Sequence, residues 1–263
     1  MATYTNPRGS VTGTADSDTF IFDTPLDNNA LVDGKEAADT IVVNRSSDRR
    51  THFIVGEQVD NGGLQGGVYY GDFYIPVTDR YISFSNIESV QFTGSGSDDR
   101  FDLTINSGSP AFQVAFDGGD GQDSLSFNFT GGGLSFVVDD ETITSSFGTF
   151  ASIESFAIRT GAGNDVVRTG AGVDFVSTGS GSDEIFTGSG RDVISTEGGG
   201  DSIDGGVGYD SWTGDFSASA ESLTFNLGST ITSSNGTAAL NIESVRIIAG
   251  SGDDQFNVTR LGT

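Results

Sequence analysis

Between Arg159 and Trp212 the hydrophobic and polar positions of the chain repeat every nine residues. Each repeat has an aspartate with a large apolar residue two positions after it. The aspartates are Asp165, Asp174, Asp183, Asp192, Asp201 and Asp210. The apolar residues are Val167, Val176, Ile185, Ile194, Ile203 and Trp212. A fixed short period predicts stacked turns, each followed by a short extended stretch that points the apolar residue into the interior.

Glycines recur in front of each aspartate. Two positions before it stand Gly163, Gly172, Gly181, Gly190, Gly199 and Gly208. Four positions before it stand Gly161, Gly170, Gly179, Gly188 and Gly206, with Glu197 as the exception. Because glycine permits positive φ, such a loop can turn tightly and present several carbonyl oxygens to one point. Carbonyls plus a carboxylate form an all-oxygen shell, which suits Ca²⁺ and not zinc or copper.

These residues resemble the RTX, or haemolysin-type, calcium-binding nonapeptide. The stretches Thr-Gly-Ala-Gly-Asn-Asp-Val-Val at 160–167 and Gly-Gly-Val-Gly-Tyr-Asp at 205–210 carry the resemblance. It implies a right-handed parallel β-roll in which an ion sits between loops eighteen residues apart. Asp165, Asp183 and Asp201 would then line one edge and Asp174, Asp192 and Asp210 the other, with Asp183 contacting two ions. The loop containing Glu197 is the weakest match.

The alternative is a calcium-free solenoid whose aspartates and glycines only make turns. Turn chemistry alone would accept Asn or Ser at a position where all six repeats have aspartate. The sequence therefore favours several bound Ca²⁺ ions.

A longer module contains the motif Ile-Glu-Ser followed by a glycine-rich acidic loop. It occurs at 123–165, at 210–254 and in an expanded form at 39–98. We expect further calcium ligands in these loops at Asp98, Asp99, Asp123, Asp253 and Asp254. The motif's glutamates either reach a calcium ion or, as we favour, face solvent or cap a rung; they are Glu88, Glu154 and Glu243.

The predicted fold is all-β, a parallel β-roll or β-solenoid with wider strand excursions between the calcium-binding rungs. We divide this one continuous solenoid into degenerate N-terminal rungs or a cap (1–44), an expanded strand module (45–122), a strand module (123–164), the nonapeptide roll (165–212) and a last strand module with an acidic loop (213–263). In the first segment Asp16 or Asp18 takes the ligand position of a degenerate rung, or the stretch is an ordinary edge strand after a turn. Calcium at Asp39 is doubtful because the glycine two residues before it is missing.

Two groups of apolar residues permit two interpretations each. The aromatic run at 68–74 is either a ligand surface or, as we favour, a face packed on its own sheet. The outward positions of the nonapeptide strands include Val166, Phe175, Phe186 and Val193. We expect the long strand excursions to cover them; the alternative is a second chain.

The composition narrows the choice of partners. The net charge is −25, with 39 glycines and no cysteine, so nucleic acid and anionic membranes would be repelled and membrane insertion is not expected. Close carboxylates also repel one another, and we therefore expect the calcium-free chain to be poorly folded. Zero cysteines exclude disulfides and thiol chemistry.

The sequence lacks the residues of common catalytic sites. A hydrolase triad or a zinc protease site needs histidines, and His52 is the only histidine in the chain. No phosphate-binding loop motif is present. We expect a protein that is not an enzyme.

We therefore expect an extracellular or cell-surface protein, exported by type I secretion as the resemblance implies. The favoured role is structural, in a surface layer, an adhesin or a biofilm matrix, with possible self-association into a filament, sheet or matrix. The alternative is a calcium-binding accessory module of a larger secreted enzyme or toxin. A polysaccharide ligand has no supporting motif.

Overall fold

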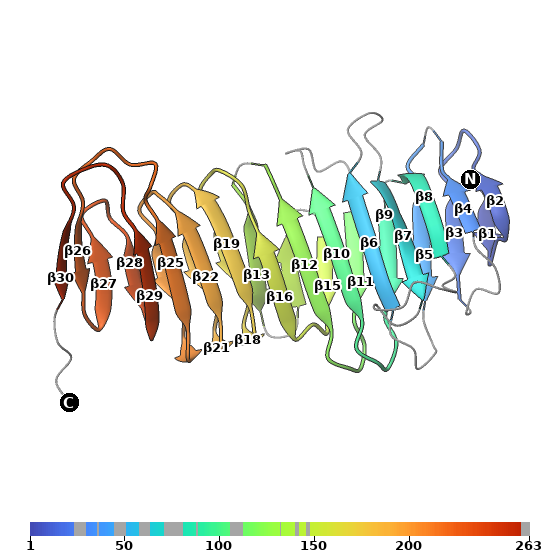
Figure 1. Ribbon diagram of the computed structural model, residues 1–263. Coiled ribbons are helices and arrows are strands. Elements are labelled where there is room, and N and C mark those ends of the chain that lie inside the picture. Colours follow the sequence, from blue (N-terminus) through green and yellow to red (C-terminus); the bar gives the residue numbers. More distant parts are fainter. Residues whose placement is uncertain are drawn as a thin grey trace. The chain divides into compact units, whose positions relative to one another are not determined.

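The computed structural model describes residues 1–23, 30–35, 37–44, 51–57, 64–70, 81–87, 89–105, 113–131, 133–139, 142–145 and 148–258. Throughout these ranges the regular structure consists of β-strands, with no helix (Figure 1). Consequently none of the described segments is a helix that could cross a membrane. The chain divides into two compact units: unit 1 contains Met1–Phe127 and Asp140–Glu154, and unit 2 contains Asn128–Asp139 and Ser155–Thr263.

Unit 1 consists of two sheets. The order of the first is β1 (Thr3–Thr5), β3 (Thr19–Phe22), β5 (Thr40–Asn44), β9 (Ser89–Thr93), β11 (Gln113–Asp117), β15 (Gly148–Ala151) and β14 (Thr142–Ser145). The order of the second is β2 (Gly9–Thr12), β4 (Ala30–Asp33), β8 (Tyr81–Ile87), β7 (Leu64–Tyr70), β6 (Thr51–Glu57), β10 (Arg100–Ile105) and β12 (Ser124–Phe129). Neighbouring rungs pair in parallel, as β3 does with β5 and β2 with β4.

Unit 2 repeats the arrangement and adds a third, small sheet. One sheet has the order β13 (Ser135–Asp139), β17 (Val166–Arg168), β20 (Glu184–Phe186), β23 (Ser202–Asp204), β28 (Ala238–Leu240), β27 (Thr230–Ser233), β26 (Thr224–Leu227) and β30 (Gln255–Val258). The facing sheet has the order β16 (Ser155–Arg159), β19 (Phe175–Ser180), β22 (Val193–Glu197), β25 (Ser211–Asp215) and β29 (Ser244–Ile248). The small sheet consists of β18 (Ala171–Gly172), β21 (Ser189–Gly190) and β24 (Val207–Gly208).

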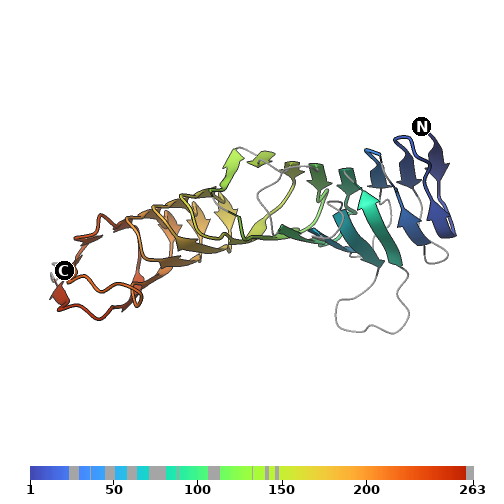
Figure 2. The same cartoon turned by 90° about the horizontal axis from the view of Figure 1, so that it is seen from above.

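A full rung of the nonapeptide region contains two repeats. Val166 pairs with Glu184, and Glu184 pairs with Ser202, so the strands of one sheet repeat every eighteen residues. Successive strands along the chain alternate between the two sheets (Figure 2). This parallel, rung-by-rung pairing confirms the predicted β-roll.

The apolar core lies between the two sheets of each unit. Side chains alternate between buried and outward positions along the strands, as the period of two in a strand requires. All six apolar residues of the nonapeptide pattern are buried, from Val167 at 0% exposure to Ile203 at 2%. In unit 1 aromatic rings fill the corresponding positions, and the ring of Phe101 stacks on Phe116 with 4.8 Å between their centroids.

The expected strand excursions are antiparallel meanders inserted between parallel rungs. In unit 1, β6, β7 and β8 form such a meander, and in unit 2 β26, β27 and β28 form another. The side chains of the aromatic run at 68–74 and of His52 lie outside the described residues.

The expectation that excursions cover the outward apolar residues is wrong for two of them. Phe186 is 41% and Val193 44% exposed. Val166 and Phe175 are half-buried, and the Arg159 guanidinium lies over the Phe175 ring, 4.7 Å from its centroid. The Phe175 ring is therefore covered in part by a neighbouring side chain on the same face.

Candidate calcium sites

The six nonapeptide aspartates form two ladders, one at each edge of the roll. Asp165, Asp183 and Asp201 directly precede the strands of one sheet, whereas Asp174, Asp192 and Asp210 precede the strands of the facing sheet. We call these the first and the second ladder. Since the two sheets face each other, the loops that enter them lie at opposite edges, as the resemblance implied.

In the first ladder each carboxylate accepts a hydrogen bond from the equivalent residue of the preceding rung. The Asp165 N–H donates to Asp183 Oδ1 at 2.9 Å, and the Asp183 N–H donates to Asp201 Oδ1 at 3.1 Å. Leu134, the residue before β13, donates its N–H to Asp165 Oδ1 at 2.5 Å. Asp183 is therefore the central carboxylate of its ladder, where the sequence predicts contact with two ions.

The second ladder has the same geometry. The N–H of Asp174 donates to Asp192 Oδ1 at 2.9 Å, and that of Asp192 donates to Asp210 Oδ1 at 2.8 Å. Phe156 donates its N–H to Asp174 Oδ1 at 2.9 Å. In both ladders the inner oxygen, Oδ1, is thus satisfied by the backbone of the neighbouring rung.

The outer oxygen is not satisfied in most of these residues. Within residues 148–258, which are described without a gap, five of the six ladder aspartates have a buried Oδ2 with no hydrogen-bond partner: Asp174, Asp183, Asp192, Asp201 and Asp210. Their side chains are at most 2% exposed. A buried carboxylate oxygen without a donor costs free energy unless a proton or a cation neutralises it.

Burial changes the acidity of these carboxyl groups accordingly. It raises the pKa of Asp174 to about 7 and that of Asp201 to about 6, in each case against nearby donors that favour the charged form. Burial also raises the pKa values of Asp183, Asp192 and Asp210. The cause is the loss of water around an ionised group, which a positive ion at the same place would compensate.

The loop glycines bring backbone carbonyls against the ladders. A Cβ atom at Gly188 would lie 1.7 Å from the carbonyl oxygen of Gly170, the equivalent residue of the previous rung. Gly188 also has φ of +88°, which a side chain disfavours. Positive φ occurs at Gly163, Gly170, Gly172, Gly181, Gly188, Gly199, Gly206 and Gly208, and not at Gly161, Gly179 or Gly190. Glycine is therefore required for close stacking of the loops, also where φ is ordinary, since a Cβ at Gly179 would lie 2.4 Å from the Gly161 oxygen.

The donor set fits a hard cation. No group of three or more His, Asp or Glu side chains able to hold a metal occurs in the described part of the chain. A cation here would therefore take part of its shell from backbone carbonyls of the glycine loops and the rest from the outer oxygens of successive ladder aspartates. Such an all-oxygen set suits Ca²⁺, which would supply positive charge at buried carboxylates.

The loops at the second ladder are joined by backbone hydrogen bonds between rungs. At the second ladder the Ser189 N–H donates to the Gly170 carbonyl at 2.8 Å, and the Val207 N–H donates to the Gly188 carbonyl at 2.7 Å. These bonds belong to the small sheet of β18, β21 and β24, which runs through the loops of this edge.

Where no further aspartate follows, another side chain accepts the hydrogen bond from the N–H of the last aspartate. Glu243 Oε2 accepts from the Asp210 N–H at 2.7 Å, and in unit 1 Glu154 Oε2 accepts from the Asp123 N–H at 2.6 Å. These glutamates cap a rung, the interpretation favoured from the sequence; Glu88 lies outside the described residues. Asp201 donates its N–H to Thr237 Oγ1 at 3.4 Å, so the first ladder ends on a hydroxyl and not on a carboxylate.

In the acidic loops outside the nonapeptide region, the predicted ligands differ in their hydrogen-bond partners. Asp99 Oδ2 accepts from the Ser95 N–H at 2.6 Å and from the Ser95 hydroxyl at 3.0 Å. Asp98 Oδ1, one residue earlier, accepts from the Gln122 N–H at 3.1 Å. Asp123 has a buried Oδ2 without a donor, and burial raises its pKa to about 7.

The last acidic loop contains Asp253 and Asp254. Asp254 Oδ1 accepts from the Leu223 N–H at 2.8 Å, which gives it the ladder position. Asp253 is exposed and donates its N–H to the Ser222 hydroxyl at 3.0 Å. The structure therefore brings Asp254, but not Asp253, into the arrangement seen in the nonapeptide loops.

Sequence reasoning missed a column of threonines beside the ladders. Thr160 donates its hydroxyl to Asp165 Oδ2 at 2.6 Å, which explains why this outer oxygen is satisfied. In the second ladder the hydroxyls of Thr169 and Thr187 instead donate to carbonyls eighteen residues later. The signal was present in the sequence, because threonine recurs every nine residues at Thr160, Thr169, Thr178, Thr187 and Thr196.

Comparison with protein families identifies the region that contains both ladders. The family model of the RTX calcium-binding nonapeptide repeat matches residues 157–185 and 177–211, with four copies of the repeat. A comparison with curated proteins gave no match. RTX repeats bind Ca²⁺ at several sites and are typical of proteins exported by type I secretion, which supports an extracellular location. Residues 157–211 of this chain are therefore RTX calcium-binding nonapeptide repeats.

Proposed function

We propose that this chain is a calcium-dependent structural protein of the bacterial cell surface or extracellular matrix that folds on binding Ca²⁺ and then associates with further copies of itself. In this proposal the protein is not an enzyme. Its charge of −25 makes nucleic acid an unfavourable partner. The observation that carries the proposal is the exposed apolar face of β29 and β30, the strands that end the two sheets of unit 2.

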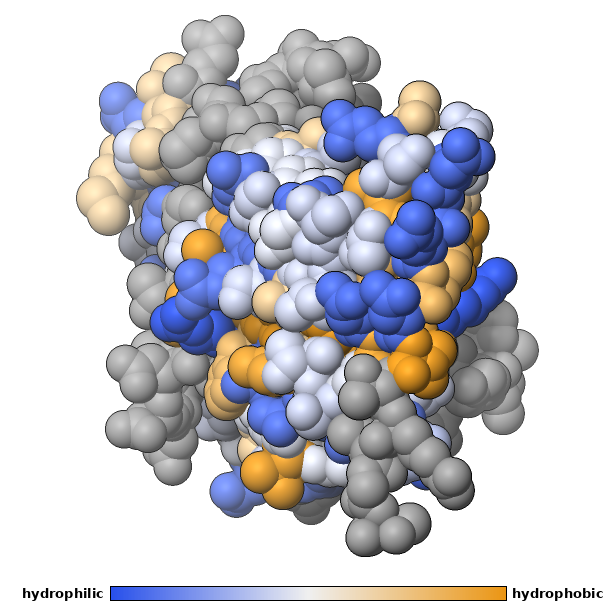
Figure 3. Space-filling model, turned by 90° about the vertical axis from the view of Figure 1, so that its left-hand side faces the viewer, coloured by the Kyte–Doolittle hydropathy of each residue, from blue (hydrophilic) through white to orange (hydrophobic). Residues whose placement is uncertain are grey.

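Side chains of β29 and β30 occupy core positions but are exposed. Phe256 pairs with buried Phe225 and stacks on it with 5.0 Å between the ring centroids, yet Phe256 is 48% exposed. Val245 pairs with buried Trp212 and is 38% exposed. Figure 3 views this end and shows hydrophobic side chains among the polar ones. A further rung would bury these side chains, at about 25 cal/mol per Å² of apolar surface.

The occupant we propose for the edge of β30 is β1 of a second copy. β30 and β29 are edge strands of the two facing sheets of unit 2, and β1 and β2 are edge strands of the two sheets of unit 1. Pairing β30 with β1 would create a parallel pair of the kind that joins the nonapeptide rungs. Such a contact is heterologous, so it generates a filament when the rotation between copies does not close a ring.

Calcium controls the process in this proposal through folding. Extracellular-type sites bind at about 10⁻⁴ to 10⁻³ M, and a tenfold excess of ion over Kd contributes only about 1.4 kcal/mol per site. Several sites must therefore act together. Unit 2, which contains both ladders, would stay loose at low calcium, which suits export, and would fold outside the cell.

The test is light scattering coupled to size-exclusion chromatography, with far-UV circular dichroism, in chelator and in millimolar calcium. We expect calcium to increase β-structure and then produce multimers. Phe256→Lys should fold with calcium but remain monomeric, whereas Gln255→Lys, with the same charge on the outward position of β30, should still assemble. A wild-type chain that folds but stays monomeric would contradict the assembly proposal.

That monomeric result would favour the second candidate, a calcium-binding accessory module of a larger secreted enzyme or toxin. The observation on its side is that the RTX match is confined to residues 157–211, because a repeat block can serve a neighbouring domain. Recovery of activity or secretion of such a domain only when the repeats are attached would support it.

A further inference from the structure

We propose that the two units differ in their need for calcium: unit 1 folds without the ion, whereas unit 2 folds only when Ca²⁺ is bound. This inference goes beyond the proposed function, because it holds whether or not the protein assembles. It rests on how the outer carboxylate oxygen of each acidic turn is satisfied.

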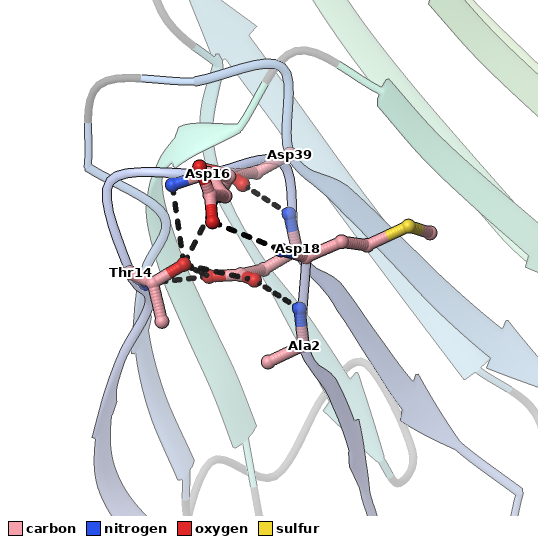
Figure 4. A network of polar contacts seen from close by, with 6 residues as sticks. Ala2, Thr14, Asp16, Asp18 and Asp39 are labelled. Carbon is pink, nitrogen blue, oxygen red and sulfur yellow. Dashed lines mark hydrogen bonds and ion pairs between the residues drawn. The ribbon is translucent and has the colours of Figure 1, made fainter.

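In unit 1 the turns around Asp18 and Asp99 are closed by their own loops. Asp18 Oδ2 accepts from the Thr14 N–H at 2.5 Å, and the Thr14 hydroxyl lies 3.0 Å from the same oxygen (Figure 4). Asp18 Oδ1 accepts from the Ala2 N–H at 2.5 Å. Asp99 repeats this arrangement with Ser95. Both carboxylates therefore have donors for the outer oxygen, Oδ2, and such turns need no cation.

The residue four positions before the aspartate distinguishes the two kinds of turn. It is Thr14 for Asp18 and Ser95 for Asp99, and these residues supply a hydroxyl as well as an N–H. At four of the five nonapeptide aspartates with an unpartnered Oδ2 it is a glycine, and at Asp201 it is Glu197. A hydroxyl residue would not fit the glycine position in the stacked loops, since a Cβ at Gly188 or Gly206 would lie within 2 Å of a carbonyl oxygen.

The buried apolar side chains also favour unit 1 folding without calcium. In unit 1 the ring of Phe101 packs against Phe92, Phe116 and Phe150, with centroid distances of 5.5, 4.8 and 6.2 Å. In the nonapeptide rungs, valine and isoleucine fill the equivalent interior. Because an aromatic side chain buries more apolar area than valine, the rungs of unit 1 that contain these phenylalanines gain more from burial. The valine and isoleucine rungs of unit 2 therefore combine a thinner core with ladder carboxylates that lack a donor at Oδ2.

Asp123 is the turn of unit 1 that resembles those of unit 2. Its outer oxygen is buried without a donor, and Gly119 stands four residues before it. We therefore expect calcium to add protection locally at β12, without being needed for the fold of unit 1.

Hydrogen exchange on the full chain separates the two units. In chelator at neutral pH, the amides of β3, β5 and β9 should be protected by at least about 100-fold relative to those of β19, β22 and β25. Millimolar calcium should protect the second group. Trp212, the only tryptophan, is 1% exposed in unit 2, so its fluorescence should report an exposed indole in chelator and a buried one with calcium.

Equal protection of both units in chelator, whether high or absent, would overturn the proposal. A chain that shows the split but remains monomeric in calcium would support this inference and contradict the assembly proposal, so the two failures are distinguishable.

A pair of variants tests the closed turn itself. Thr14→Ala removes the hydroxyl beside Asp18, and Thr12→Ala removes an exposed hydroxyl two residues earlier in β2. In chelator Thr14→Ala should lower the melting temperature of unit 1 by about 2–4 °C, as loss of a cap does. Thr12→Ala should leave it within about 1 °C. Equal shifts for the two variants would show that the hydroxyl does not close the turn.

Discussion

At the scale of single residues, the two oxygens of one carboxylate have different roles. Oδ1 of Asp183 accepts from the Asp165 N–H and so registers one rung on the next. Oδ2 of the same residue is buried without a donor. The first role is structural and independent of charge, whereas the second creates the demand for a cation. A substitution that separates the two roles is therefore informative.

Asp183→Asn provides that separation. The amide oxygen can still accept from the Asp165 N–H, but the buried charge is lost. We expect the calcium midpoint for folding to rise roughly tenfold or more, while the calcium-free chain becomes easier to fold. A calcium titration followed by Trp212 fluorescence measures both effects.

Glu184→Gln is the matched control for Asp183→Asn. It removes one negative charge at the next residue, which is exposed and paired with Arg168. We expect little change in the midpoint, because exposed ion pairs contribute only about 0–1 kcal/mol. Equal midpoints for the two variants would rule out Asp183 as a ligand. The sequence also predicts that Asp183→Ala weakens calcium-induced folding more than replacement of Glu88.

At the scale of the elements, the loops stack as closely as the strands. Parallel pairing aligns Val193 with Phe175 and Ser211 with Val193, and the glycine loops between these strands stack with the same repeat. On the second edge this stacking extends to the small sheet of β18, β21 and β24. The loops therefore tolerate no side chain where the carbonyl of the previous rung approaches.

Gly188→Ala should disrupt this stacking. Its Cβ would lie 1.7 Å from the Gly170 oxygen at a φ of +88°, so both the close approach and the backbone conformation oppose it. We expect the variant to require several-fold more calcium to fold, or to fail to bury Trp212. Gly96→Ala is the control, because a Cβ there has no atom within 4 Å and φ is not positive. An unchanged calcium response in Gly188→Ala would contradict the stacking argument.

At the scale of the whole molecule, acidity and calcium compete for the same oxygens. The net charge of −25 disfavours compaction, and the buried ladder carboxylates in unit 2 concentrate the effect there. Protons and Ca²⁺ both neutralise these groups. The stability of unit 2 must therefore depend on pH when calcium is absent.

The sign follows from the pKa values. Burial raises the pKa of Asp174 to about 7 and that of Asp201 to about 6, from 3.8. The folded state thus binds more protons than the unfolded state between about pH 4 and 7, so stability is highest at the acidic end and falls as pH rises through this window. In chelator we expect Trp212 to become buried near pH 4.5 and exposed at pH 7.5. Trp212 fluorescence that stays the same across this range would contradict the raised pKa values.

Much of this protein could be predicted from its sequence because the relevant information is local and periodic. A nine-residue spacing of aspartate, glycine and apolar residues requires stacked turns with an apolar interior, and the buried series from Val167 to Trp212 confirms it. The resemblance to the RTX nonapeptide implied that the ladders alternate between two edges, as the structure has them. The five sequence segments and the individual calcium ligands remain predictions.

The tertiary structure alone decided which oxygens are satisfied. Thr14 and Ser95 close the turns of Asp18 and Asp99, whereas equivalent aspartates in unit 2 keep an oxygen without a donor. Exposure of Phe186 and Val193, where cover was expected, was likewise decided there. The physical reason is that stacking between rungs decides which loops leave room for a hydroxyl residue beside the carboxylate, as at Thr14 and Ser95, and which accept only glycine, as at Gly188. Stacking also decides which outward side chains are covered.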